Sequence, residues 1–255
     1  MRKWIAGLLL TLAAPALAAD IHVMISAGFF GVYSELGPAF EKATGHKLVT
    51  TRGPSMGDSP EAIPTRLARG EAADVVIMDG HGVDALAAKG LVRADAKMLL
   101  AKSQVGMVVK QGAPRPDIST VEAFKKALLD AKSIAYSDSG SGTYLSTKLF
   151  PQMGVMDQIA GKSRKVRGPP SGEPVANVVA RGEAQIGFQQ VSELIHVQGV
   201  DFVGALPAEL QPGFSFAGGV TTNAREAQAA EALLKFLSAP EAAPVITKAG
   251  LAPPR

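Results

Sequence analysis

Apolar residues in this chain follow two alternating patterns. Short runs of Val, Ile and Met stand between polar residues, and the run at 74–78 is continuous, which is typical of a strand covered on both faces. Longer stretches space their apolar residues three or four apart, which predicts amphipathic helices. The predicted strands are residues 20–25, 46–51, 74–78, 105–110, 133–136, 185–188, 200–204 and 214–220. The predicted helices are residues 32–43, 60–69, 83–89, 120–129, 143–152, 174–181, 226–237 and 241–248.

The order of these elements predicts an α/β fold. Three strand-then-helix units follow one another, and the pattern repeats with new material after residue 105. We expect two lobes, each with a mixed, mostly parallel sheet flanked by helices. Lobe 1 comprises residues 19–105 plus 212–255, and lobe 2 comprises the inserted residues 106–211. Two crossings between lobes imply a hinge and a ligand cleft. One continuous doubly wound sheet is the alternative.

The first 18 residues carry the pattern of a secretory signal. Arg2 and Lys3 precede an apolar run, which ends in the small-x-small sequence Ala16-Leu17-Ala18. We expect cleavage near Ala18 and a periplasmic mature chain without stable membrane insertion. An uncleaved anchor is the alternative, although the run is shorter than the ~20 apolar residues that span a bilayer.

Composition excludes several classes of function. Without Arg2 and Lys3, 24 basic residues stand against 23 acidic ones, so nothing draws the mature chain to nucleic acid or anionic lipid. Aromatic residues make up only 5% of the chain, too few for a base-stacking surface. The absence of Cys excludes disulfides and thiol nucleophiles. The four histidines lack metal-site spacing, so we expect neither metal nor cofactor.

Four loops follow predicted strands, at the edge where open α/β sheets bind ligands: residues 26–31, 52–59, 79–82 and 137–144. The fourth is the most informative. Its glycines let backbone N–H groups converge, and it leads into a helix N-terminus, which favours an anion. Ordinary helix capping by Ser and Thr explains the same residues without a ligand. The ligand-binding candidates in the fourth and first loops are Ser139, Ser141, Gly142, Thr143, Tyr144, Ser26 and Gly28.

The second loop brings basic side chains to the same edge. Arg52 precedes Ser55 and Met56, and Arg66 follows on the next predicted helix. We expect all four to contact the ligand, since a guanidinium matches a carboxylate. A solvent-exposed helix face is the alternative for Arg66. The loop also matches the G-x-S-x-G elbow of serine hydrolases, but Asp58, Ser59 and two prolines separate its serine from the helix.

Two further side chains are candidates for chemistry. His81 follows a buried strand and is expected to face the cleft, where its neighbour Asp79 could orient the ring for a functional role. An ordinary loop histidine is the alternative. Gln190 follows the strand predicted at 185–188, where its amide suits a carboxylate or hydroxyl. A solvent-facing turn is the alternative there.

Five segments carry a family resemblance: IHVMISA at 21–27, FEKATG at 40–45, RGEAADVVI at 69–77, YSDSGSGTY at 136–144 and RGEAQIGF at 181–188. The mature chain resembles the type II periplasmic solute-binding proteins, especially the group around the periplasmic molybdate-binding protein. The resemblance implies two lobes that close on a ligand. In molybdate binders a serine ends the loop after the first strand and a tyrosine in the second lobe contacts molybdate. Gly28 and Gln190 stand at these positions here, which argues against molybdate.

The segments RGPSMG at 52–57 and PEAIPTRLARGE at 60–71 are similar to a subgroup that contains bacterial aconitate isomerases. Two functions follow. The first is a binding protein that closes on a small anion, a polycarboxylate rather than molybdate, and delivers it to an inner-membrane ABC permease. The second is an isomerase that interconverts cis- and trans-aconitate in the same cleft. His81 would then be its base, with Asp138 or Glu173 as substitutes. Arg52, Arg66 and the amides of 139–143 would stabilise the anion.

Overall fold

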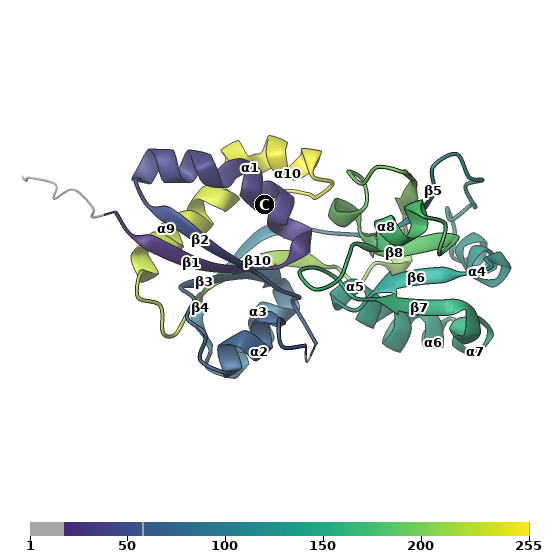
Figure 1. Ribbon diagram of the computed structural model, residues 1–255, viewed down its shortest axis with the longest axis horizontal. Helices are drawn as coiled ribbons and strands as arrows, with labels where there is room; N and C mark the ends of the chain where they lie inside the picture. Colours follow the sequence, from purple (N-terminus) through teal and green to yellow (C-terminus); the bar gives the residue numbers. More distant parts are fainter. Residues whose placement is uncertain (1–17, 58, 255) are drawn as a thin grey trace, which may run out of the picture.

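The structure is a computed structural model, and it describes residues 18–57 and 59–254. Its strands form two five-stranded sheets, each flanked by helices, which make up two lobes lying side by side (Figure 1). The predicted α/β class with two mixed sheets is confirmed. The signal predicted for residues 1–18 lies outside the described residues, except for Ala18. Within the described part of the chain, no helix is both long and apolar enough to cross a membrane.

The sheet of the first lobe has the strand order β2-β1-β3-β10-β4. β1 runs parallel to β2 and β3, whereas β10 runs antiparallel to β3 and β4. The strands are β1 (Asp20–Ile25), β2 (Lys47–Arg52), β3 (Val75–Asp79), β4 (Val92–Lys102) and β10 (Ser215–Thr221). The helices are α1 (Ala27–Thr44), α2 (Ile63–Ala68), α3 (Gly80–Ala88), α9 (Ala227–Ser238), η5 (Pro240–Ala242) and α10 (Ala243–Lys248).

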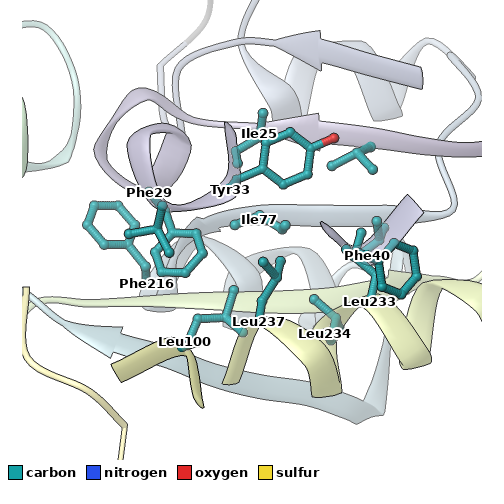
Figure 2. Close-up of a cluster of buried hydrophobic side chains, with 14 of the residues drawn as sticks. Ile25, Phe29, Tyr33, Phe40, Ile77, Leu100, Phe216, Leu233, Leu234 and Leu237 are labelled. Atoms are coloured by element: carbon teal, nitrogen blue, oxygen red, sulfur yellow. The ribbon is translucent and has the colours of Figure 1, made fainter. Parts of the chain in front are cut away.

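Both faces of this sheet are covered, as the apolar run at 74–78 predicts. Side chains alternate along β1, so that Val23 and Ile25 face α1, α9 and α10 while Met24 faces α2 and α3. Figure 2 shows the first of these cores, in which Leu233 and Leu237 of α9 are fully buried. Burial of each such leucine stabilises the fold by about 1.5–3 kcal/mol.

The second lobe repeats the same layout with the strand order β7-β6-β8-β5-β9. β6 runs parallel to β7 and β8, and β5 runs antiparallel to β8 and β9. The strands are β5 (Val105–Lys110), β6 (Ile134–Ser137), β7 (Ser163–Val166), β8 (Ile186–Gln190) and β9 (Val200–Ala205). The helices are α4 (Val121–Asp130), α5 (Gly140–Tyr144), η1 (Leu145–Leu149), α6 (Phe150–Gln152), α7 (Met156–Ile159), η2 (Ala160–Lys162), α8 (Val175–Ala180), η3 (Val191–Glu193) and η4 (Ala208–Leu210).

The chain passes between the sheets twice, from β4 to β5 and from β9 to β10. The second sheet is therefore inserted between two strands of the first. The lobe limits at residues 105 and 211 stay a prediction. Because β1, β2 and β3 are parallel, their carboxyl ends share one edge of the first sheet, and those of β6, β7 and β8 share one edge of the second.

Three of the four predicted loops are wrong in part. Residues 27–31, 80–82 and 140–142 lie in the first turns of α1, α3 and α5. Ser26 and Asp79 are the N-caps, and the Asp79 carboxylate accepts hydrogen bonds from the amides of His81 and Gly82. Two glycines in each helix start obscured the pattern, because glycine disfavours helix interiors by roughly 1 kcal/mol relative to alanine.

Two strands were missing from the sequence prediction. β4 and β7 are edge strands, and each carries several polar, exposed residues. A strand that leaves much of its surface in water lacks the apolar run by which the buried strands were found.

Candidate functional site

A cleft lies where the two lobes meet. It is bordered by the carboxyl ends of β1, β2 and β3 in the first lobe and of β6, β7 and β8 in the second, the edge at which open α/β sheets bind ligands. The helical segment that starts at α5 lies on the side of the second lobe that faces the first (Figure 1). Side chains that line the cleft are Ser26, Ser55, Asp79, Phe216, Ser137, Asp138, Ser139, Ser141, Gln189, Gln190 and Glu193.

Two serines of the first lobe offer hydroxyl groups to the cleft. Ser26 is buried at the N-cap of α1, and its Oγ has no hydrogen-bond partner in the described part of the protein. Ser55 is also buried, and its Oγ accepts a hydrogen bond from the Asp79 amide at 3.2 Å. A buried hydroxyl without a partner costs about 1–3 kcal/mol.

The second lobe adds the serine-rich segment between β6 and α5. Ser139 is the N-cap of α5, and Ser137 Oγ lies 3.2 Å from Ser141 Oγ and accepts the Gly142 amide at 3.3 Å. A Cβ on Gly142 would lie 1.7 Å from the Ser137 carbonyl oxygen, so only glycine lets the helix start directly against the strand. This close approach brings Ser139 and Ser141 to the cleft.

Three carboxyl groups also line the cleft. Asp79 caps α3 with Oδ1, while its Oδ2 is buried and has no partner among the described residues. Burial raises the pKa of Asp79, and hydrogen bonds from the His81 and Gly82 amides partly offset this. Asp138 accepts the Gly168 amide at 3.1 Å.

Glu193 is the third carboxyl group, and the sequence analysis missed it. It lies in η3, directly after β8, and Gln189 Nε2 donates to its Oε2 at 2.6 Å. Burial raises the pKa of Glu193 to about 7, although the Gln189 hydrogen bond and the charge of Arg52 act in the opposite direction. The one sequence signal was an acidic residue three positions beyond Gln190, at the carboxyl end of a predicted strand.

The predicted arginine contacts do not line the cleft. Arg66 pairs with Glu71 at 2.6 Å and donates from Nε to the Glu61 carbonyl oxygen at 3.0 Å. The Arg52 guanidinium lies over the Phe30 ring, 4.1 Å from its centroid, and burial lowers its pKa while attraction by Glu193 opposes this. Among the described residues, the polar side chains that line the cleft carry hydroxyl, amide and carboxyl groups, and none of them is Arg or Lys.

Five other predicted site residues also lie outside the cleft lining, and Gly142, in the tight start of α5, is one of them. His81 is exposed on the first turn of α3 instead of facing the cleft. The Tyr144 hydroxyl donates to the Leu210 carbonyl oxygen at 2.9 Å, and Thr143 stands beside it on the same helix. Met56 is partly exposed, and its Sδ lies 3.6 Å from the place that a Cβ on Gly140 would take. Met56 therefore lies across the gap between the lobes.

Gly28 and Gln190 do line the cleft, and both help to place the lobes. A Cβ on Gly28 would lie 2.1 Å from Phe216 Cζ, so α1 packs tightly on β10 at this point. The Gly28 carbonyl oxygen accepts a hydrogen bond across the lobes from Ser192 Oγ at 2.7 Å. Gln190 Oε1 accepts from Ser103 Oγ at 2.5 Å, beside the first crossing between the lobes. A second bridge joins Ser171 Oγ to Glu61 Oε2 at 2.5 Å.

This arrangement defines what the cleft can do chemically. Hydroxyl and amide donors on both lobes can hold the oxygen atoms of a small anion. Burial raises the pKa of Glu193 to about 7, so this carboxyl group can hold or move a proton near neutral pH, and burial also raises the pKa of Asp79. Within residues 18–57 and 59–254, no three His, Asp or Glu side chains gather as metal ligands would.

Two known proteins are similar to this chain along nearly its whole length. The chain is 47% identical to the aconitate isomerase of a Pseudomonas species over 251 residues, 97% of this chain and 94% of that protein. It is 27% identical to the molybdate-binding protein ModA of Azotobacter vinelandii over 247 residues, 94% of this chain and 92% of that protein.

Solved structures share the fold. The periplasmic molybdate-binding protein of Azotobacter vinelandii superimposes with a TM-score of 0.72 at 21% identity, over 92% of this chain and all of that one. The sulfate-binding protein SubI of Mycobacterium tuberculosis superimposes with a TM-score of 0.71 at 19% identity, over 92% of this chain and 87% of that one. Residues 21–252 match the family described as bacterial extracellular solute-binding protein, and the chain belongs to that family.

Proposed function

We propose that this protein is an exported aconitate isomerase that works in the interlobe cleft. The observation that carries the proposal is the 47% identity with the Pseudomonas aconitate isomerase along nearly the whole of both chains. The carboxyl groups of raised pKa in the cleft support it, because a protein that only binds its ligand has no need of a proton carrier. We place the mature protein in the periplasm, as the sequence of the first 18 residues indicates.

The reaction is a proton shift along an allyl system. A base removes a proton from the methylene carbon of aconitate, and the electron pair of the broken C–H bond forms a new double bond to the central carbon. The old double bond opens, and its far carbon takes the proton back. Negative charge builds on a substrate carboxylate between the two steps, so hydrogen-bond donors fixed near that carboxylate lower the barrier.

Hydroxyl donors supply this stabilisation in place of guanidinium groups. The Ser26 hydroxyl lacks a protein partner, and the Ser139 and Ser141 side chains line the opposite wall of the cleft. Hydroxyl and amide donors hold an anion without salt-bridge partners when they are fixed beforehand.

Delivery of a polycarboxylate to an inner-membrane ABC permease is the second candidate. It is supported by the likeness of the fold to periplasmic binding proteins and by the hydrogen bonds that bridge the lobes. Delivery requires only that the ligand prefers the closed form of the two lobes.

An ultraviolet assay of the purified mature chain separates the two candidates. We expect cis-aconitate to disappear with catalytic amounts of protein, and the saturated analogue tricarballylate to bind by calorimetry without change. Tight binding of aconitate without conversion would support delivery instead. Molybdate and sulfate serve as control ligands, and binding of these in preference to tricarballylate would contradict both polycarboxylate proposals.

A further inference from the structure

Four ionisable groups lie in or beside the cleft, and their contacts distinguish them. Asp79 uses Oδ1 to cap α3, and its Oδ2 is enclosed. Asp138 is held by the Gly168 amide. Arg52 lies on the Phe30 ring, with its charge close enough to Glu193 to lower the pKa of that carboxyl group. Glu193 therefore differs from the two aspartates, because its hydrogen bond comes from a side chain rather than from the backbone.

The position of Glu193 is fixed from two sides. Gln189 Nε2 donates to Oε2 at 2.6 Å, while Gln189 Oε1 accepts the Val175 amide at 3.1 Å and so is itself held by the start of α8. The described residues offer no hydrogen bond to Glu193 Oε1. The neighbouring Ser192 bonds to Gly28 of the first lobe at 2.7 Å, so the segment that carries Glu193 lies against the other wall of the cleft.

We propose that Glu193 is the general acid–base of this cleft. Its Oε1 takes the proton from the methylene carbon of a bound unsaturated tricarboxylate and returns it at the far end of the allyl system. Gln189 and Arg52 are positioning residues. The inference rests on the proposed function. The first step breaks the C–H bond and forms an O–H bond on Glu193. The second step reverses this at the other carbon, so that Glu193 ends as a carboxylate and no co-reactant is consumed.

The surroundings of Glu193 suit this role. A general base works best when its pKa lies near the operating pH, and burial holds Glu193 at about 7. The predicted base His81 is exposed and outside the cleft lining. The substitute Glu173 is tied to Arg181 by hydrogen bonds of 2.6 Å and also lies outside the lining. Asp138 and Asp79 are the remaining competitors in the cleft.

The test compares Glu193→Gln with Asp79→Asn, Asp138→Asn and the exposed control Glu209→Gln. We expect Glu193→Gln to lower kcat for aconitate by about 10²- to 10⁴-fold. Its affinity for tricarballylate should stay within about threefold of wild type, which also shows that the variant folds. Glu209→Gln should keep wild-type turnover.

Wild-type turnover in Glu193→Gln, or a loss confined to Asp79→Asn or Asp138→Asn, overturns the assignment of Glu193 and leaves the isomerase proposal intact. Absence of turnover in the wild type overturns the isomerase proposal itself.

The positioning role of Arg52 has its own readout. The base acts as a carboxylate, so kcat/KM for the wild type should rise with pH and level off above about pH 7. The charge of Arg52 lowers the pKa of Glu193, so Arg52→Gln should move this rise to higher pH. Arg69→Gln, which removes an exposed guanidinium paired with Glu71, is the matched control and should leave the profile unchanged. An unchanged profile in Arg52→Gln overturns the positioning role.

Discussion

At the scale of single residues, the cleft keeps polar atoms in states that cost stability. Ser26 Oγ and Asp79 Oδ2 are buried without partners among the described residues, and Glu193 is a half-buried carboxyl group whose pKa is raised to about 7. Buried polar atoms that lower stability in this way are typical of sites that bind a ligand or transfer a proton. Sequence alone found Ser26 because it follows a strand. It could not predict the surroundings of Glu193. They include the charge of Arg52, the Gln189 hydrogen bond and the nearby first lobe, which come together only in the folded protein.

Glu193→Gln should stabilise the protein above neutral pH. The pKa of Glu193 is about 7 in the folded protein against 4.5 for a free side chain, so the folded state binds the proton more tightly. The free energy of unfolding of the wild type therefore falls as pH rises between these values, whereas the variant has no such proton to lose. Urea unfolding measures this near pH 5 and pH 8. From the lower to the higher pH, the free energy of unfolding of the variant should rise by about 2–3 kcal/mol relative to that of the wild type. Equal pH dependence in both proteins would contradict the raised pKa.

Arg66→Ala should leave ligand affinity unchanged, contrary to the expectation from sequence. Its guanidinium is engaged with Glu71 and the Glu61 carbonyl oxygen, outside the cleft lining. We expect tricarballylate to bind within about threefold of wild type, and the free energy of unfolding to fall by about 1 kcal/mol. Arg69→Ala is the control, and a large loss of affinity in Arg66→Ala alone would return Arg66 to the site.

At the scale of elements, the sequence indicated what is buried and missed what is exposed or rich in glycine. β3 was predicted because all five of its residues are buried and all except Asp79, at its end, are apolar. β4 and β7, at sheet edges, were not found. The starts of α1 and α3 were taken for loops because Gly28, Gly31, Gly80 and Gly82 lie there. Glycine is required at position 28 because any side chain would collide with Phe216. Phe216 is distant in the sequence, so local helix propensity cannot predict this requirement.

Gly142→Ala should displace the start of α5. A Cβ at this position would lie 1.7 Å from the Ser137 carbonyl oxygen, so the strand and the helix must separate. We expect a loss of about 1–3 kcal/mol in the free energy of unfolding, with weaker binding of tricarballylate because Ser139 and Ser141 move with the helix. Gly161→Ala, where a Cβ meets nothing within 4 Å, is the control. If both variants bind tricarballylate like the wild type, the serine-rich segment does not hold the ligand.

At the scale of the whole molecule, the cleft exists only because the lobes are held together across it. Ser192 bonds to Gly28 and Ser171 bonds to Glu61, and each of these bonds joins one lobe to the other. The two-lobe architecture followed from the repeated strand-then-helix order. The pairing of particular residues across the cleft did not, because partners 164 and 110 positions apart leave no local pattern.

Ser192→Ala should shift the protein toward more open conformations. One hydrogen bond contributes about 0.5–1.5 kcal/mol, so the affinity for tricarballylate should fall about 2- to 10-fold, and small-angle scattering should give a larger radius of gyration without ligand. Ser34→Ala is the matched control, since the Ser34 hydroxyl bonds at 3.0 Å to Gly31 within α1. Identical scattering and affinity in the two variants would show that the bridge does not govern closure.

The central claim is that the cleft converts its ligand rather than carrying it. The most direct test is proton NMR of wild-type protein mixed with a large molar excess of cis-aconitate near neutral pH. We predict that the olefinic signal of trans-aconitate appears and grows past one equivalent of protein until the two isomers reach equilibrium. A ligand that binds the protein and is recovered entirely as the cis isomer would contradict the claim.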